Sequence, residues 1–248
     1  MSLPEVVSRE EWLVARKNLL AQEKEMTRKR DALNADRRRL PMVRIDKEYF
    51  FEGPDGTTSL PDLFDGCNQL IVQHVMYGPD WEKACPGCTA SLDELAPARL
   101  KHLKSRDTAF VGISRAPYSK INSYATERGW SFPWYSSFGS EFNYDFGVTF
   151  DQSRGYVQYN YRDIPELVGS DPAPAGDESG EVPGFSSFLR VGDDVFHTYS
   201  TYARGTEMVD GGTYYLLDMT ALGRQEEWEE PKGRVSANAK PADPSFTS

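Results

Sequence analysis

The sequence has few cysteines, no long hydrophobic run and no overall surplus of positive charge, and each of these absences excludes a class of protein. Three cysteines in 248 residues are too few for the disulfide framework of a small secreted domain. No stretch approaches the roughly 20 apolar residues of a membrane-spanning helix, and the first residues lack the basic start and apolar stretch of a secretory signal. We therefore predict a cytoplasmic protein with no membrane partner.

The formal charge of −10 at pH 7 argues against general nucleic-acid binding, because phosphate contacts need a surplus of lysine and arginine. The charge is nevertheless polarised. Residues 9–39 carry ten basic and six acidic side chains, a surplus of four, which leaves −14 for the rest of the chain. With 39% hydrophobic and 12% aromatic residues, the chain has enough apolar surface to bury a core.

The first forty residues have the pattern of one long helix. Ser8 and Glu11 have the spacing of a capping box, and neither glycine nor proline interrupts the sequence from there to Pro41. The positions that recur every seven residues are apolar: Trp12, Leu19, Met26, Leu33 and Leu40. The positions that would complete a coiled-coil heptad are mostly polar, so the stripe is narrow. We predict a helix over 8–40 that docks along one seam, on its own domain or on a second copy in a homodimer.

From residue 43 on, the pattern changes to strands that alternate with helices. Apolar runs at 70–77 and 108–114 are typical of buried strands, helices are expected over 89–104 and 118–128, and a hairpin is expected around 192–194. Together these elements predict an α/β fold with a mixed central sheet flanked by helices. We place this domain at 41–230.

Three further stretches do not fit the alternation of strand and helix. Residues 169–184 are rich in proline, glycine and acidic side chains and are predicted to form a flexible loop, and 231–248 is predicted to be a disordered tail. Residues 130–161 hold twelve of the chain's 31 aromatic residues. Because aromatic side chains dominate burial energies, this aromatic-rich insertion is predicted to be core. Its density would also suit a cover over a neighbouring site.

The motif Cys85-Pro86-Gly87-Cys88 carries the clearest chemistry in the sequence. It follows a predicted buried strand and opens a predicted helix, whose N-terminal amides and positive dipole lower the pKa of a thiol from roughly 8.5 toward 7 or below. A Cys85 thiolate could attack a disulfide or a peroxide, and Cys88, one turn away, could resolve the product to an internal disulfide. Pro86 at the first helical position costs no hydrogen bond. The motif therefore predicts redox chemistry.

Other interpretations of the cysteines stay open. A structural or inert pair is compatible with the absence of an obvious catalytic base nearby. A zinc site would need four ligands, and only Cys67 and one of three histidines remain to complete it, so we expect no metal and no cofactor. Cys67 is interpreted as a bystander, His74 as a core histidine and His197 as a surface histidine.

Several blocks of the sequence carry a family resemblance. They are Asp55-Gly56, Ser59-Leu60 with Asp62-Leu63-Phe64 and Gly66, the strand to Tyr77, the two motif cysteines, Val111-Gly112-Ile113-Ser114 and Phe132-Pro133-Trp134. These blocks resemble the thioredoxin superfamily, in its peroxiredoxin-like branch. The segment 37–41 and the blocks 132–146 and 195–205 are more narrowly similar to a bacterial family of thioredoxin-like proteins of unknown function. The resemblance runs from about Val6 to Glu230 and implies a thioredoxin-like fold.

The resemblance also implies roles for individual residues. The redox motif of the superfamily falls on Cys85 and Cys88, with its usual middle pair, Gly-Pro, reversed here to Pro86-Gly87. The superfamily's proline that faces the redox pair, normally cis, is best matched by Pro183. Its aromatic neighbour of the nucleophile is matched by Trp81.

Other functional groups of the superfamily have no clear counterpart. The buried acid of thioredoxin would fall near Gln73 or His74, neither of which is a carboxylate. A second alignment, with the bacterioferritin-comigratory class of peroxiredoxins, makes Cys88 the peroxidatic cysteine. In this alignment Cys85 stands where that class has a threonine. Only Arg190 and Arg115 are available there as weak substitutes for the arginine that orients peroxide.

From these observations we predict a thiol–disulfide oxidoreductase that uses Cys85 and Cys88. The alternatives are a thiol peroxidase that uses Cys88 or Cys85, and a non-catalytic binding module on the thioredoxin frame. The expected partners are a protein or small-molecule disulfide, or a peroxide, together with a thiol reductant.

Overall fold

The computed structural model describes residues 3–151, 154, 158–163, 180–224 and 227–233. The chain divides into two compact units: one contains the described residues up to Pro41 together with those between 212 and 233, and the other contains Met42–Gly211. The sequence did not suggest this grouping, and the predicted limits 8–40 and 41–230 stay a prediction. Most of the predicted loop 169–184 and of the predicted tail 231–248 lies outside the described residues.

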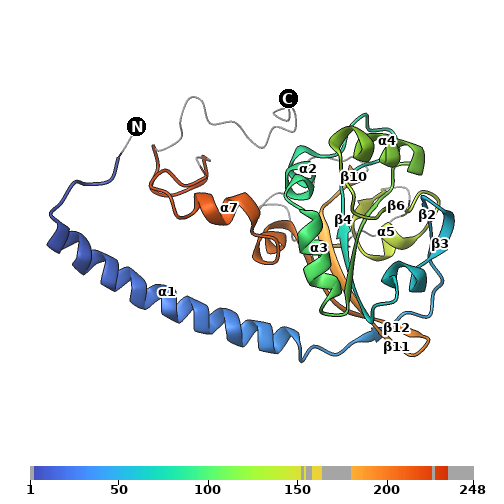
Figure 1. Ribbon diagram of the computed structural model, residues 1–248, viewed down its shortest axis with the longest axis horizontal. Helices are drawn as coiled ribbons and strands as arrows, with labels where there is room; N and C mark the ends of the chain where they lie inside the picture. Colours follow the sequence, from blue (N-terminus) through green and yellow to red (C-terminus); the bar gives the residue numbers. More distant parts are fainter. Residues whose placement is uncertain (1–2, 152–153, 155–157, 164–179, 225–226, 234–248) are drawn as a thin grey trace. The chain divides into compact units, whose positions relative to one another are not determined.

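The first unit contains the long helix α1 (Arg9–Arg37) and the short helix α7 (Gly212–Leu217), both labelled in Figure 1. The predicted capping box begins α1. The Ser8 N–H donates to the Glu11 carboxylate at 2.9 Å, and the Glu11 N–H donates to the Ser8 hydroxyl at 3.2 Å, so two donors at the helix end are satisfied. Within this unit the Arg30 guanidinium lies over the ring of Tyr215 at 5.9 Å. The prediction of a long N-terminal helix is confirmed.

The second unit is built around an eight-stranded mixed sheet with the order β1-β12-β11-β4-β5-β6-β2-β3. Strands β4, β5 and β6 are parallel, whereas β11 pairs antiparallel with β4 and β12 pairs antiparallel with β11. The strands of this sheet are β1 (Val43–Arg44), β2 (Phe50–Gly53), β3 (Gly56–Ser59), β4 (Gln69–His74), β5 (Thr108–Ser114), β6 (Trp134–Ser136), β11 (Gly184–Val191) and β12 (Asp194–Tyr202). Parallel strands joined by helices, with an antiparallel hairpin next to β4, form the thioredoxin-like arrangement, so the predicted fold is confirmed.

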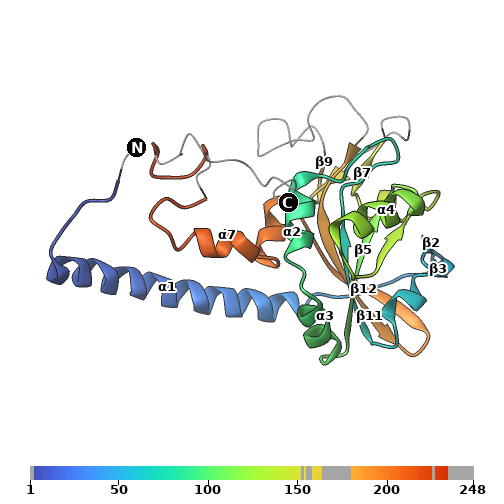
Figure 2. The ribbon, with the colours of Figure 1, turned by 45° about the horizontal axis from the view of Figure 1, so that its top comes forward.

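Helices cover both faces of this sheet, as Figures 1 and 2 show. One face carries α2 (Pro86–Asp93), α3 (Pro97–Lys104) and α4 (Tyr118–Arg128), and the other carries the 3₁₀ helix η1 (Pro61–Phe64) and α5 (Phe142–Asp145). Side chains of a strand alternate between faces. Leu70 and Val72 accordingly join the cluster under α5, whereas Val75 joins the cluster under α2.

Short elements complete the unit. Strand β7 (Thr149–Phe150) pairs with β10 (Gly180–Glu181), β8 (Gln158–Tyr159) pairs with β9 (Arg162–Asp163), and a 3₁₀ helix, η3 (Ala203–Met208), follows β12. The aromatic-rich insertion contributes to both faces: Phe142 and Phe146 pack 4.5 Å apart in one cluster, and Trp134 belongs to the other. These rings of the insertion lie in the core, as predicted, whereas the Phe138 side chain is 56% exposed.

The helix expected over 89–104 is two helices. Helix α2 ends at Asp93, and α3 begins at Pro97. Proline has no N–H to continue a helical ladder and its ring clashes with the preceding turn, so Pro97 is tolerated only as the start of a new helix. The break leaves α2 as a short helix whose first turn carries the two motif cysteines.

Gly184 is a position where a close neighbour leaves no room for a side chain. A Cβ there would lie 2.7 Å from the Tyr202 ring and 3.3 Å from the Thr201 carbonyl oxygen. We expect Gly184→Ala to lower the free energy of unfolding by about 1–3 kcal/mol, as overpacking does in other cores, measured by urea denaturation. Gly180→Ala is the matched control, because a Cβ at Gly180 meets nothing within 4 Å. Equal losses in the two variants would contradict the steric explanation.

Candidate redox site

Cys85 and Cys88 lie at the edge of the sheet where β4 ends. After β4 the chain runs through residues 75–84 and returns, so that the Cys85 N–H donates to the Met76 carbonyl at 2.9 Å. Cys85 is the N-cap residue of α2, and Pro86 is its first helical residue. Because proline has no N–H, this position leaves no backbone donor unsatisfied.

Hydrogen bonds lower the pKa of Cys85 to about 6. The largest contribution comes from the Cys88 thiol, which donates to the Cys85 sulfur. The backbone N–H groups of Cys88 and Gly87 add to it, and partial burial works in the opposite direction. A thiol with such a pKa is about nine-tenths thiolate at pH 7. Both cysteines are free thiols, so this is the reduced form of the pair.

Cys88 has the opposite environment. Its pKa is raised well above the ordinary value of a thiol, because it donates a hydrogen bond to Cys85 and because it is buried. It packs in the cluster under α2 with Leu92, Tyr124 and Trp134. The pair therefore combines a half-buried thiolate with a buried, protonated partner, which is the asymmetry that ordered disulfide exchange requires.

The loop before Cys85 is held in place by a side chain that the sequence did not single out. Lys120 of α4 donates through Nζ to the carbonyl oxygens of Pro79 at 2.7 Å and Trp81 at 3.1 Å. Trp81 is half-buried and packs against the same cluster as Cys85. Its ring lies so close to Gly78 that a Cβ there would meet Nε1 at 3.0 Å.

Pro183 precedes β11, at the same edge of the sheet. The register pairs Gly184 with His74, the last residue of β4, and the Val182 N–H donates to the Val148 carbonyl at 2.9 Å. Among the described residues the cis peptide bond is Glu230-Pro231, so the bond before Pro183 is trans, unlike the usual bond of the superfamily. The register of β11 with β4 brings Pro183 to the edge that carries the dithiol.

Gln73, one of the two positions where thioredoxin has its acid, takes part in a polar chain against the redox helix. Its side-chain amide donates to the Ser91 hydroxyl at 3.2 Å, and Ser91 donates to the Asp210 carboxylate at 2.5 Å. Arg99 pairs with the same carboxylate at 3.3 Å. The segment after η3 thus places the Asp210 carboxylate beside α2, at Ser91, about one turn beyond Cys88. No local sequence signal marks Asp210.

His74 lies on the other face of the sheet and is fully buried. Its Nε2 is 2.8 Å from the Ser186 hydroxyl, Ser186 is 2.7 Å from the Ser200 hydroxyl, and Ser200 is 2.7 Å from His197 Nε2. Burial lowers the pKa of His74 to about 3 and lowers the pKa of His197 as well. His74 is therefore a neutral core histidine, as interpreted from the sequence. The surface interpretation of His197 is wrong, because its ring faces the same core.

Two residues discussed from the sequence lie at the opposite end of the sheet. Cys67 is buried just before β4 begins, where its N–H donates to the Phe64 carbonyl at 2.8 Å. Arg190 lies near the end of β11, with its N–H bonded to the Asn68 carbonyl at 2.8 Å. Strand β4 separates both from the dithiol, so neither belongs to the site.

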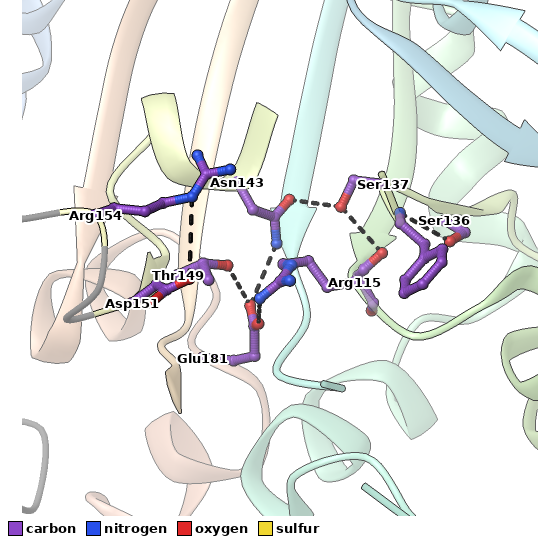
Figure 3. A network of polar contacts seen from close by, with 10 residues as sticks. Arg115, Ser136, Ser137, Asn143, Thr149, Asp151, Arg154 and Glu181 are labelled. Atoms are coloured by element: carbon purple, nitrogen blue, oxygen red, sulfur yellow. Dashed lines mark hydrogen bonds and ion pairs between the residues drawn. The ribbon is translucent and has the colours of Figure 1, made fainter. Parts of the chain in front are cut away.

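Arg115, in contrast, lies at the dithiol edge, within the polar network of Figure 3. It directly follows β5, and the N–H of the next residue, Ala116, donates to the Tyr77 carbonyl at 2.7 Å. Its guanidinium pairs at 3.2 Å with Glu181, a buried carboxylate that also accepts hydrogen bonds from two other buried side chains. The sequence did not single out Glu181.

Among the described residues, no group of three or more histidine, cysteine and acidic side chains could hold a metal ion. No helix in the described part of the chain is long and apolar enough to cross a membrane.

Comparison with known proteins gives one family match. The model of a family described as a bacterial protein of unknown function, DUF899, matches residues 1–241. A search of curated protein sequences finds no match.

The solved structures that resemble the chain do so weakly. The bacterioferritin comigratory protein of Xanthomonas campestris is 12% identical, with 65% of this chain and 85% of that chain covered and a TM-score of 0.44. The peroxidoxin BcpB of Mycobacterium tuberculosis is 14% identical, with 73% and 98% covered and a TM-score of 0.47. A PrxQ mutant of Xylella fastidiosa is 12% identical, with 68% and 89% covered and a TM-score of 0.41.

Proposed function

The chain belongs to the DUF899 family of bacterial proteins of unknown function, and we propose that it is a thiol–disulfide oxidoreductase in which Cys85 is the nucleophile and Cys88 the resolving thiol. The observation that carries the proposal is the pKa of Cys85, lowered to about 6 by donors at the start of α2. Structural cysteines in apolar surroundings have raised pKa values, as Cys67 does here.

The reaction follows from the asymmetry of the pair. The Cys85 thiolate attacks one sulfur of a substrate disulfide, a mixed disulfide forms, and the other substrate sulfur leaves as a thiolate. Cys88 then loses its proton and attacks Cys85, the internal disulfide forms, and the second substrate sulfur leaves. The substrate gains two electrons and the protein loses two, so a thiol reductant must regenerate the dithiol.

The neighbouring residues have supporting roles in this proposal. Pro86 and Gly87 let the first turn of α2 direct its amides at Cys85. Trp81 and Pro183 form the surroundings that a substrate disulfide would meet. We place the reaction in the cytoplasm, with a homodimer through α1 as the proposed assembly.

Alkylation of Cys85 as a function of pH tests the proposal. With Cys67 replaced by serine, the rate of reaction with a neutral alkylating reagent should rise with a midpoint near pH 6, because only the thiolate reacts. In Cys88→Ala the midpoint should shift upward, because alanine has no donor to replace the thiol that bonds to the Cys85 sulfur. A midpoint at or above 8.5 in the parent protein would remove the physical basis of the proposal.

A further inference from the structure

The edge of the sheet that carries Cys85 also carries one arginine whose guanidinium is only partly used within the protein. Two consecutive residues after β4 bind both segments: the Met76 carbonyl accepts from Cys85, and the Tyr77 carbonyl accepts from Ala116, the residue after Arg115. The segment that begins with Arg115 and the segment that holds Cys85 therefore contact the same short stretch of chain after β4.

Contacts with Glu181 and Tyr144 hold the Arg115 side chain in place. Figure 3 shows Arg115 and Glu181 pointing toward one another, with Asn143 and Thr149 around the carboxylate. One carboxylate oxygen of Glu181 accepts from Arg115 at 3.2 Å, and the other accepts from Thr149 at 2.7 Å and from Asn143 at 3.4 Å. The guanidinium also lies over the ring of Tyr144 at 4.7 Å. These contacts fix the direction of the guanidinium before any ligand binds.

Part of the Arg115 side chain reaches solvent. The Arg115 side chain is 22% exposed, whereas the Glu181 side chain is 4% exposed. A guanidinium has five N–H donors in a fork that fits a carboxylate. Its bond to Glu181 uses one of its terminal nitrogens, so donors remain for a second anion.

A nearby arginine provides a contrast. Arg154 lies over the same Tyr144 ring at 3.8 Å, but both of its terminal nitrogens donate to Glu141, at 2.5 and 2.9 Å. Asp151 lies 4.0 Å from its Nε. Both terminal nitrogens of Arg154 are therefore bonded to a carboxylate of the protein, whereas only one terminal nitrogen of Arg115 is.

We propose that Arg115 binds an anionic group of the disulfide that Cys85 attacks, so that the preferred substrates are disulfides with a carboxylate beside the sulfur bond. This inference rests on the proposed function and names its substrate class. Glu181 acts as a positioning residue, because it holds the guanidinium through one terminal nitrogen and does not bond to the other donors. The hydrogen bonds that lower the pKa of Cys85 come from Cys88 and Gly87, so the contribution of Arg115 is to substrate binding.

Three small disulfides of similar size test the proposal: dithiodipropionate, which is anionic, bis(hydroxyethyl) disulfide, which is neutral, and cystamine, which is cationic. The full-length protein should have its lowest KM for dithiodipropionate. Arg115→Met should raise that KM about ten-fold, the usual value of one hydrogen bond between charged groups, and leave the KM of the neutral disulfide unchanged. Arg154→Met is the matched control and should keep the preference.

Because Arg115→Met leaves Glu181 without its cation, the double variant Arg115→Met/Glu181→Gln serves as a second test with both charges removed. Turnover of the neutral disulfide reports whether each variant is folded. Equal KM values for the three disulfides in the parent protein, or equal losses for all three in both Arg115 variants, would overturn the inference but leave the oxidoreductase proposal intact. Failure to reduce any of the three would overturn both.

Discussion

Cys85→Ser is expected to reduce disulfide reduction to the uncatalysed background. A serine hydroxyl at the start of α2 receives the same hydrogen bonds, but it is not ionised near neutral pH and cannot open a sulfur–sulfur bond. Reduction of bis(hydroxyethyl) disulfide, or of insulin, in the presence of a thiol reductant measures the loss. Cys67→Ser is the matched control and should keep full activity, because Cys67 is buried at the far end of β4.

Cys88→Ser should give a different result from Cys85→Ser. Without the resolving thiol, the first attack still occurs and the mixed disulfide between Cys85 and the substrate accumulates. Mass spectrometry of the intact protein should show one bound substrate half in Cys88→Ser and none in Cys85→Ser. Bound substrate in Cys85→Ser but not in Cys88→Ser would reverse the assigned roles.

The same assays separate the three functions considered from the sequence. A thiol peroxidase would consume peroxide in the presence of a reductant and leave disulfides unreduced. A non-catalytic binding module would do neither, and both cysteine variants would behave like the parent protein. Disulfide reduction that depends on Cys85 is the outcome that only the oxidoreductase predicts.

Acid is expected to destabilise the second unit through His74. Its pKa is about 3 in the folded protein against an ordinary value of 6.5, so between these values the unfolded chain binds a proton that the folded protein does not. The stability that His74 contributes is therefore fully present above pH 6.5 and is lost as the pH falls toward 3. Between pH 7 and pH 4 the loss from this residue is about 3 kcal/mol.

Urea denaturation at several pH values measures this effect. The free energy of unfolding of the parent protein should fall by about 3 kcal/mol more than that of His74→Gln between pH 7 and pH 4, since glutamine does not titrate. His102→Gln, a substitution on the exposed surface of α3, should keep the slope of the parent protein. An identical slope in His74→Gln would show that the buried imidazole does not control acid stability.

Local patterns in the sequence were sufficient for much of the frame. Ser8 and Glu11 predict the start of α1, because a capping box involves residues three apart. The apolar run of β4 and the motif that follows it place two cysteines at the first turn of a helix, and the hydrogen bonds that lower the pKa of Cys85 come from that turn. Pro97 shows the limit even here, because it divides into two helices a segment whose spacing otherwise predicts one.

The rest was decided by the pairing of distant strands. The antiparallel register of β11 with β4 and β12 brings Ser186 and Ser200 between His74 and His197, and this turns inward a histidine that looked like a surface residue. The same packing joins Arg115 to Glu181, 66 residues away, and Ser91 to Asp210, 119 residues away. Such contacts leave no periodic mark in the sequence, because each depends on the register and layering of the whole sheet. The sequence by itself thus determined where the thiolate forms, whereas only the tertiary structure decided which charges surround it.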